Sequence, residues 1–132
     1  NQSWLAALTT ILDASALIMA GLQDRPTSQA RLTFAMARHT VVDLSQVFNT
    51  PPRNQRRKRL HPEDLARLHT ALRAAGLNPD DPGGQRLAHF QQLYEPYVEA
   101  LAHYLQMSVP PWIIVTSQKD NWQTTAWEPE QS

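Results

Sequence analysis

The chain of 132 residues contains no cysteine. This absence excludes disulfide bridges, thiolate zinc sites and thiol nucleophiles. The chain has only four glycines, and they form neither a GxxxxGK[ST] nor a GxGxxG phosphate-binding loop. Its twelve basic and twelve acidic residues cancel, whereas a general nucleic-acid binder is usually more basic than this. We therefore expect no nucleic acid as a partner and no cofactor.

The motifs of common hydrolases are missing as well. The sequence holds no GxSxG or SxxK nucleophile motif and no HExxH zinc motif. His39 and Asp43 stand four residues apart, as do Glu99 and His103. On a helix this spacing is more typical of a surface pair than of a metal site. We therefore predict neither a catalytic residue nor a bound metal, and expect the chain not to be an enzyme.

Strand signals are scarce, and helix signals predict an all-α fold. Four helices are expected: one capped by Ser3 and ending at Gly21, one from residues 26–28 to 48, one from Pro62 to Gly76, and one from about residue 85 to 106 with a kink at Pro96. Short loops favour antiparallel neighbours in a compact bundle of four to five helices. We expect a single domain, with the bundle in residues 1–116 and an irregular tail in 117–132. In the second helix the expected apolar face is Leu32, Met36, Val41, Leu44 and Phe48.

The first helix is apolar enough to raise the question of a membrane span. Residues 3–22 are about long enough to cross a bilayer, but Asp13 lies in the middle, where it would cost about 2.5–3.5 kcal/mol. A central core helix and an oligomer interface are the other two interpretations. We favour the core helix, in which Asp13 needs a partner because a lone buried carboxylate is very unfavourable. Arg38 or His39 of the second helix is the expected partner.

The predicted polar cluster therefore contains Asp13, Arg38, His39 and Asp43. We interpret it as a structural ion pair that fixes helix register. A buried Asp–His pair that titrates near neutral pH is the alternative. A third possibility is a small acid–base enzyme that uses Asp13, His39 and Asp43, and it requires a pocket where these three side chains converge.

Two further features suggest contact surfaces. A basic run comprises Arg53, Arg56, Arg57, Lys58 and Arg59, which fits a solvated loop or a contact with anionic lipid headgroups. The four tryptophans either pack back onto the bundle or anchor a partner subunit, so the candidate interface residues are Trp4, Trp112, Trp122 and Trp127.

The stretches NQSWLAALTTILDASALIMAGL and QARLTFAMARHTVVDLSQVF, within residues 1–50, resemble a region that follows the pore in bacterial potassium-channel-like, or two-pore-domain, ion-channel proteins. The resemblance implies a soluble cytosolic domain at the inner membrane, belonging to a longer protein whose pore helices lie upstream. The start at Asn1 rather than Met fits such a fragment. We therefore expect a non-catalytic structural or regulatory domain that aids assembly or gating and associates with copies of itself. A stand-alone helical adaptor that binds another protein is the alternative.

Overall fold

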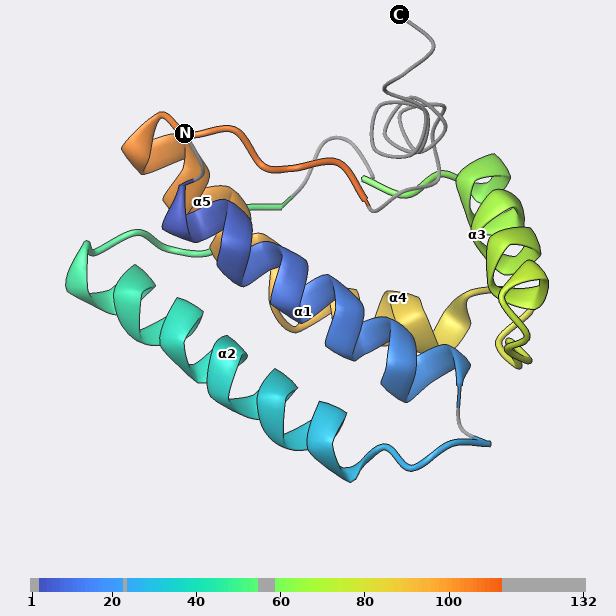
Figure 1. Ribbon diagram of the computed structural model, residues 1–132. Helices are drawn as coiled ribbons and strands as arrows, with labels where there is room; N and C mark the ends of the chain where they lie inside the picture. The colour runs from blue at the N-terminus through green and yellow to red at the C-terminus, as the bar shows by residue number, and fades with distance from the viewer. Residues whose placement is uncertain (1–2, 23, 55–58, 113–132) are drawn as a thin grey trace, which may run out of the picture.

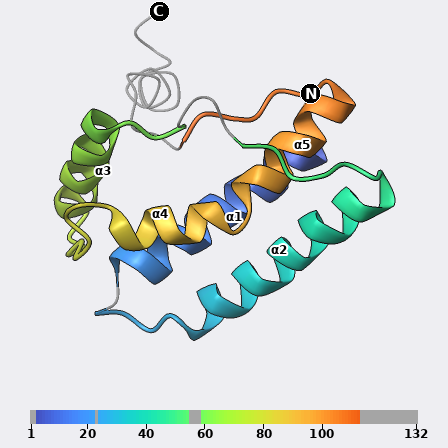
Figure 2. The same ribbon diagram turned by 180° about the vertical axis from the view of Figure 1, so that it is seen from behind.

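The computed structural model describes residues 3–22, 24–54 and 59–112, and these residues form five helices and no strand. The helices are α1 (Trp4–Gly21), α2 (Ser28–Val47), α3 (Pro62–Ala74), α4 (Gln85–Gln92) and α5 (Glu95–Leu105). The prediction of an all-α helical bundle is confirmed. Figure 1 shows α1 through the middle of the bundle, α2 antiparallel beside it and α3 set apart at one end. Seen from behind, α4 and α5 follow one another along the other side of α1 (Figure 2).

The central position of α1 agrees with the core-helix interpretation. Ser3 caps the helix, because its side-chain oxygen accepts a hydrogen bond from the backbone N–H of Ala6 at 3.0 Å. Within the described residues α1 is the one helix long and apolar enough to span a membrane, yet 56% of it is buried inside the fold. Leu5 and Leu12 are fully buried. A helix covered on several sides by other helices needs little polar surface of its own.

The predicted apolar face of α2 is partly wrong. Val41 is fully buried, but Leu32 and Met36 are 56% and 63% exposed. The residues that face the core are the small Ala30 and Ala37, with Phe34, Val41 and Ser45. Alanine lets two helix backbones approach closely, so packing against α1 selects this stripe rather than the one with the larger side chains.

The predicted fourth helix is two helices. α4 ends at Gln92 and α5 begins at Glu95, so Pro96 lies in the first turn of α5 and does not kink a longer helix. Proline is well suited to that position because the first N–H groups of a helix have no partner within it. The corner between the two helices turns Tyr94 and Glu95 into the interior, where they are 0% and 6% exposed.

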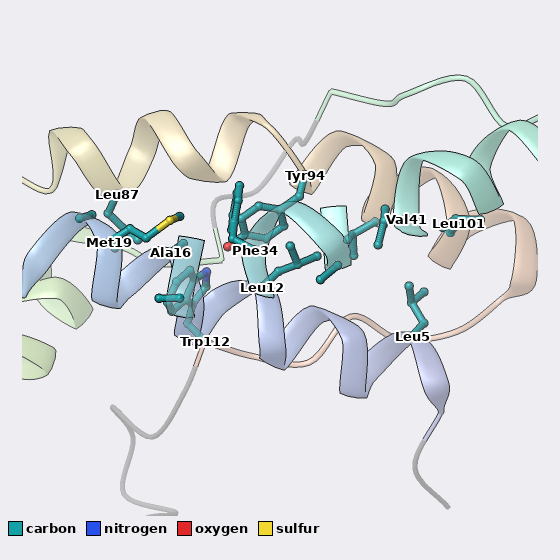
Figure 3. Close-up of a cluster of buried hydrophobic side chains, with 14 of the residues drawn as sticks. Leu5, Leu12, Ala16, Met19, Phe34, Val41, Leu87, Tyr94, Leu101 and Trp112 are labelled. Atoms are coloured by element: carbon teal, nitrogen blue, oxygen red, sulfur yellow. The ribbon is translucent and has the colours of Figure 1, made fainter. Parts of the chain in front are cut away.

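The hydrophobic core lies between α1, α2, α4 and α5 and is closed by Trp112. The Phe34 ring packs edge-on against Phe90 and Tyr94, with 5.7 Å between ring centroids in both pairs. Trp112, in the segment after α5, is 2% exposed and lies in the same cluster (Figure 3). The last described residue therefore belongs to the core and not to a surface tail.

Candidate functional site

A single arginine joins two buried carboxylates inside the bundle. Arg59 Nη1 donates to Asp13 Oδ1 at 3.1 Å, and Nη2 donates to Asp13 Oδ2 at 2.5 Å. Nη1 also donates to Glu95 Oε2 at 3.0 Å. The side chains are 9%, 2% and 8% exposed for Arg59, Asp13 and Glu95. Two carboxylates thus share one positive charge in a largely water-free place.

Two aromatic side chains, Tyr94 and Trp112, complete this group. We call the five residues together the Arg59 cluster: Asp13, Arg59, Tyr94, Glu95 and Trp112. The Tyr94 hydroxyl donates to Asp13 Oδ1 at 2.8 Å, and the indole N–H of Trp112 donates to Glu95 Oε2 at 3.3 Å. The guanidinium of Arg59 also lies 5.5 Å from the centroid of the Trp112 ring. The cluster brings together α1, the segment before α3, the corner between α4 and α5, and the segment after α5.

The donors of Arg59 are fully used. Its Nε and Nη2 donate to the backbone carbonyl of Pro110 at 3.2 and 3.1 Å, in addition to the bonds to the two carboxylates. A guanidinium has five N–H donors, and these contacts occupy all of them. Among the described residues, every side-chain nitrogen or oxygen atom that is itself fully shielded from solvent has a hydrogen-bond partner. The arginine therefore has no donor left for an incoming anion.

The charge imbalance changes how the carboxyl groups titrate. Burial raises the pKa of Asp13 and of Glu95, and the nearby Arg59 offsets this only in part. One guanidinium cannot neutralise two carboxylates, so the pair takes up a proton more readily than two exposed carboxyls would. Burial and the neighbouring carboxylates raise the pKa of Tyr94, which keeps its hydroxyl a hydrogen-bond donor.

We expect the Arg59 cluster to make stability depend on pH. Because the folded pKa values of Asp13 and Glu95 lie above the ordinary 3.8 and 4.5, their contribution to the free energy of unfolding is largest below those ordinary values. That contribution is lost as the pH rises through the folded values. The Glu95→Gln variant should therefore gain less stability than the native protein as the pH falls from 8 to 4, measured by urea unfolding.

His69 changes the stability with pH in the opposite direction, and comparing the variant with the native protein cancels its contribution. Burial lowers the pKa of His69, so its contribution is lost as the pH falls, but it is the same in both proteins. Glu99→Gln removes a carboxyl from α5 outside the cluster and should follow the native profile. Superposable profiles for the native protein and Glu95→Gln would contradict the assignment.

The predicted partner of Asp13 is wrong. Arg38 Nε donates instead to the carbonyl of Leu93 at 2.6 Å, and its guanidinium lies 5.8 Å from the centroid of the Tyr97 ring. His39 forms a 3.0 Å pair with Asp43. The side chains of that pair are 77% and 53% exposed, because both residues lie on the outward side of α2.

The proposed acid–base set is consequently not assembled. Asp13 is buried beneath Arg59, while His39 and Asp43 point away from the core. The structure brings no two of the four predicted cluster residues together except His39 and Asp43. Nor is any group of three or more histidine, aspartate or glutamate side chains placed to hold a metal among the described residues.

The two members of the basic run that the structure describes differ in exposure. Arg53 is exposed, but Arg59 is buried, so its assignment as a lipid contact is wrong. Residues 56–58, with Arg56, Arg57 and Lys58, lie outside the described residues.

The two tryptophans that the structure describes also differ in exposure. Trp4 is 43% exposed and remains a candidate interface residue, whereas Trp112 is buried and is not free to anchor a partner. Trp122 and Trp127 lie outside the described residues.

A cleft of about 430 Å³ lies beside the Arg59 cluster, between the start of α3 and the side of α4. Arg59 and Glu95 form its buried end. Its walls combine apolar and polar side chains, chiefly Leu60, Leu65, Leu87 and Ala88 with Asn54, His61, Gln91 and Gln92. Gly84, which has a positive φ of 68°, lets α3 approach closely, since a Cβ there would lie 2.7 Å from a methyl carbon of Leu65.

Comparisons with known proteins identify no relative. No family description, no curated protein and no solved structure matches the chain. Any functional assignment therefore depends on the residues and their geometry.

Proposed function

We propose that this chain is a non-catalytic helical domain that joins copies of a longer, channel-like membrane protein on the cytoplasmic side of the membrane. The channel context depends on the resemblance of residues 1–50 alone. The joining role depends on one structural observation, which is the distribution of apolar side chains on α2.

The outward side of α2 carries larger apolar side chains than much of its inward side. Leu32, Met36 and Val47 are 56%, 63% and 75% exposed, and we call these three residues the α2 outer stripe. Two of the inward residues are only alanines. The exposed pair His39–Asp43 lies between Met36 and Val47 on the same side of the helix. Large apolar side chains on an exposed helix face mark a surface that associates with another protein.

A second copy of this chain is the occupant that fits the stripe. Leu32 stands seven residues before His39, and Val47 stands seven after Thr40. Two antiparallel α2 helices related by a twofold axis near the His39–Thr40 bond would therefore place Leu32 of each helix beside Val47 of the other. The same axis places Met36 beside Asp43, so apolar pairs lie at the two ends of the contact and polar groups near its centre. A patch that pairs with itself in this way is what a twofold interface requires. The domain has a formal net charge of zero, so two copies do not repel each other through net charge.

Light scattering over a concentration series tests this role. We expect the native domain to form a dimer or a larger symmetric assembly without detergent, and Met36→Glu to be a monomer. Ile11→Glu is the matched control, because Ile11 is an exposed apolar residue of α1 at 43% exposure. It should leave the assembly intact.

Two results would overturn the proposal. A native domain that stays monomeric would remove the joining role. Loss of assembly in Ile11→Glu but not in Met36→Glu would place the interface on α1. The channel context has its own test, since the gene upstream of Asn1 should encode hydrophobic spans and a glycine-containing filter.

A further inference from the structure

The cleft beside the Arg59 cluster has the composition of a small-molecule site. Its volume of about 430 Å³ lies within the range of ligand pockets. Leu60, Leu65 and Leu87 offer an apolar wall. Among the residues that the structure describes, the charged side chains at the buried end of the cleft are Arg59 and Glu95. The ligand class therefore depends on which hydrogen-bond donors, acceptors and charges of those two side chains are still unpaired.

Arg59 offers no free donor to an anion. All five N–H donors of Arg59 are taken by Asp13, Glu95 and the carbonyl of Pro110. A carboxylate or phosphate that reached the Arg59 end of the cleft would find none of the guanidinium donors free, and it would lie beside the carboxyl group of Glu95.

A cation is favoured by Glu95. Its Oε2 accepts hydrogen bonds from both Arg59 and Trp112, but among the described residues no hydrogen bond reaches its other oxygen, Oε1. Glu95 is only 8% exposed through its side chain, and it lines the cleft. When both carboxyl groups are ionised, two carboxylates with one guanidinium leave one negative charge without a counterion, which a bound ammonium group would neutralise.

From these contacts we propose that the cleft binds a small aliphatic amine. The ammonium group donates to Glu95 Oε1, and the hydrocarbon part lies against Leu65 and Leu87. The polar side chains of His61, Gln91 and Gln92 line the same cleft and suit a ligand with a second polar end. This inference is independent of the joining role of α2.

Nuclear magnetic resonance of the indole N–H groups tests the site directly. The Trp112 indole N–H reports on the cluster because it is hydrogen-bonded to Glu95. At pH 8, where an aliphatic amine stays protonated, butylamine should shift this signal and bind at least tenfold more tightly than 1-butanol. Similar affinities for the amine and the alcohol, or no binding of either, would overturn the proposal.

Two variants and one control variant locate the binding. Glu95→Gln should abolish the preference for the amine, whereas Glu99→Gln removes the same charge from α5 outside the cleft and should retain it. Ala88→Trp fills the cleft from an exposed position and should block binding with the helical content unchanged by circular dichroism. Amine binding that survives Ala88→Trp would show that the site lies elsewhere.

A last probe distinguishes a free amine from a protein side chain. Nα-acetyl-lysine methylamide carries the same ammonium group on a peptide backbone. It should bind more weakly than butylamine if the cleft takes a free ligand. Tighter binding of the lysine derivative would replace the small-molecule assignment with a lysine of a protein partner.

Discussion

Replacing Arg59 with methionine is expected to lower the free energy of unfolding by about 3–5 kcal/mol at pH 7. The variant keeps most of the side-chain length but leaves Asp13 and Glu95 buried with no positive charge between them. The carbonyl of Pro110 loses both of its bonds to the guanidinium at the same time. Urea unfolding followed by circular dichroism measures the loss, and the extrapolated value in water is compared with that of the native protein.

Arg67→Met is the matched control. Arg67 forms a 3.3 Å pair with Asp64, but its side chain is 61% exposed, so its loss should change the unfolding free energy by no more than about 0.5 kcal/mol. A similar small effect for Arg59→Met would contradict the assignment of a buried ion cluster.

A combined variant separates lost charge pairing from lost packing. Adding Asp13→Asn and Glu95→Gln to Arg59→Met removes the uncompensated charges and should recover part of the stability. No recovery at all would mean that the arginine contributes through its hydrocarbon chain and its contact with Trp112.

The order of the helices follows from local signals that act over a few residues. Ser3 is a good N-cap, and Pro62 followed by Glu63 and Asp64 suits a helix start. The break between α4 and α5 was missed because Pro96 fits either the interior of one kinked helix or the first turn of a new one. Periodicity alone cannot separate these cases, since apolar residues continue through the corner at Leu93 and Tyr94.

The face that a helix buries was harder to predict than the helix itself. In α2 the large side chains suggested a core face containing Leu32 and Met36, but close packing against α1 selected the stripe with Ala30 and Ala37. The preference for a small residue depends on the distance between two helix axes, which is a property of the fold and not of the segment.

The need for a partner of Asp13 could be predicted, but the identity of that partner could not. Burying a carboxylate is costly enough to require a partner. Arg59 lies 46 residues from Asp13 along the chain and ends a run of five cations. Nothing in the sequence distinguishes Arg59 from Arg53 as the buried member.

The second large effect is expected when Trp112 is replaced with alanine. This change should lower the free energy of unfolding by about 3–5 kcal/mol. Trp112 is among the largest side chains that the fold buries, and it packs within the main hydrophobic core (Figure 3). Its removal leaves a cavity, deprives Glu95 of one hydrogen-bond donor and removes the ring that lies against the Arg59 guanidinium. Urea unfolding again gives the measurement.

Trp112→Phe and Trp4→Ala give this prediction its controls. Phenylalanine retains much of the volume and loses the indole N–H, so it should cost less than the alanine variant, about 1–3 kcal/mol. Trp4 is 43% exposed, and its replacement with alanine should be the mildest of the three changes. Equal losses for Trp112→Ala and Trp4→Ala would mean that the segment after α5 is not anchored in the core. The graded order Trp112→Ala, Trp112→Phe, Trp4→Ala would support the anchoring of this segment in the Arg59 cluster, since Trp112 is buried and bonded to Glu95 whereas Trp4 is exposed.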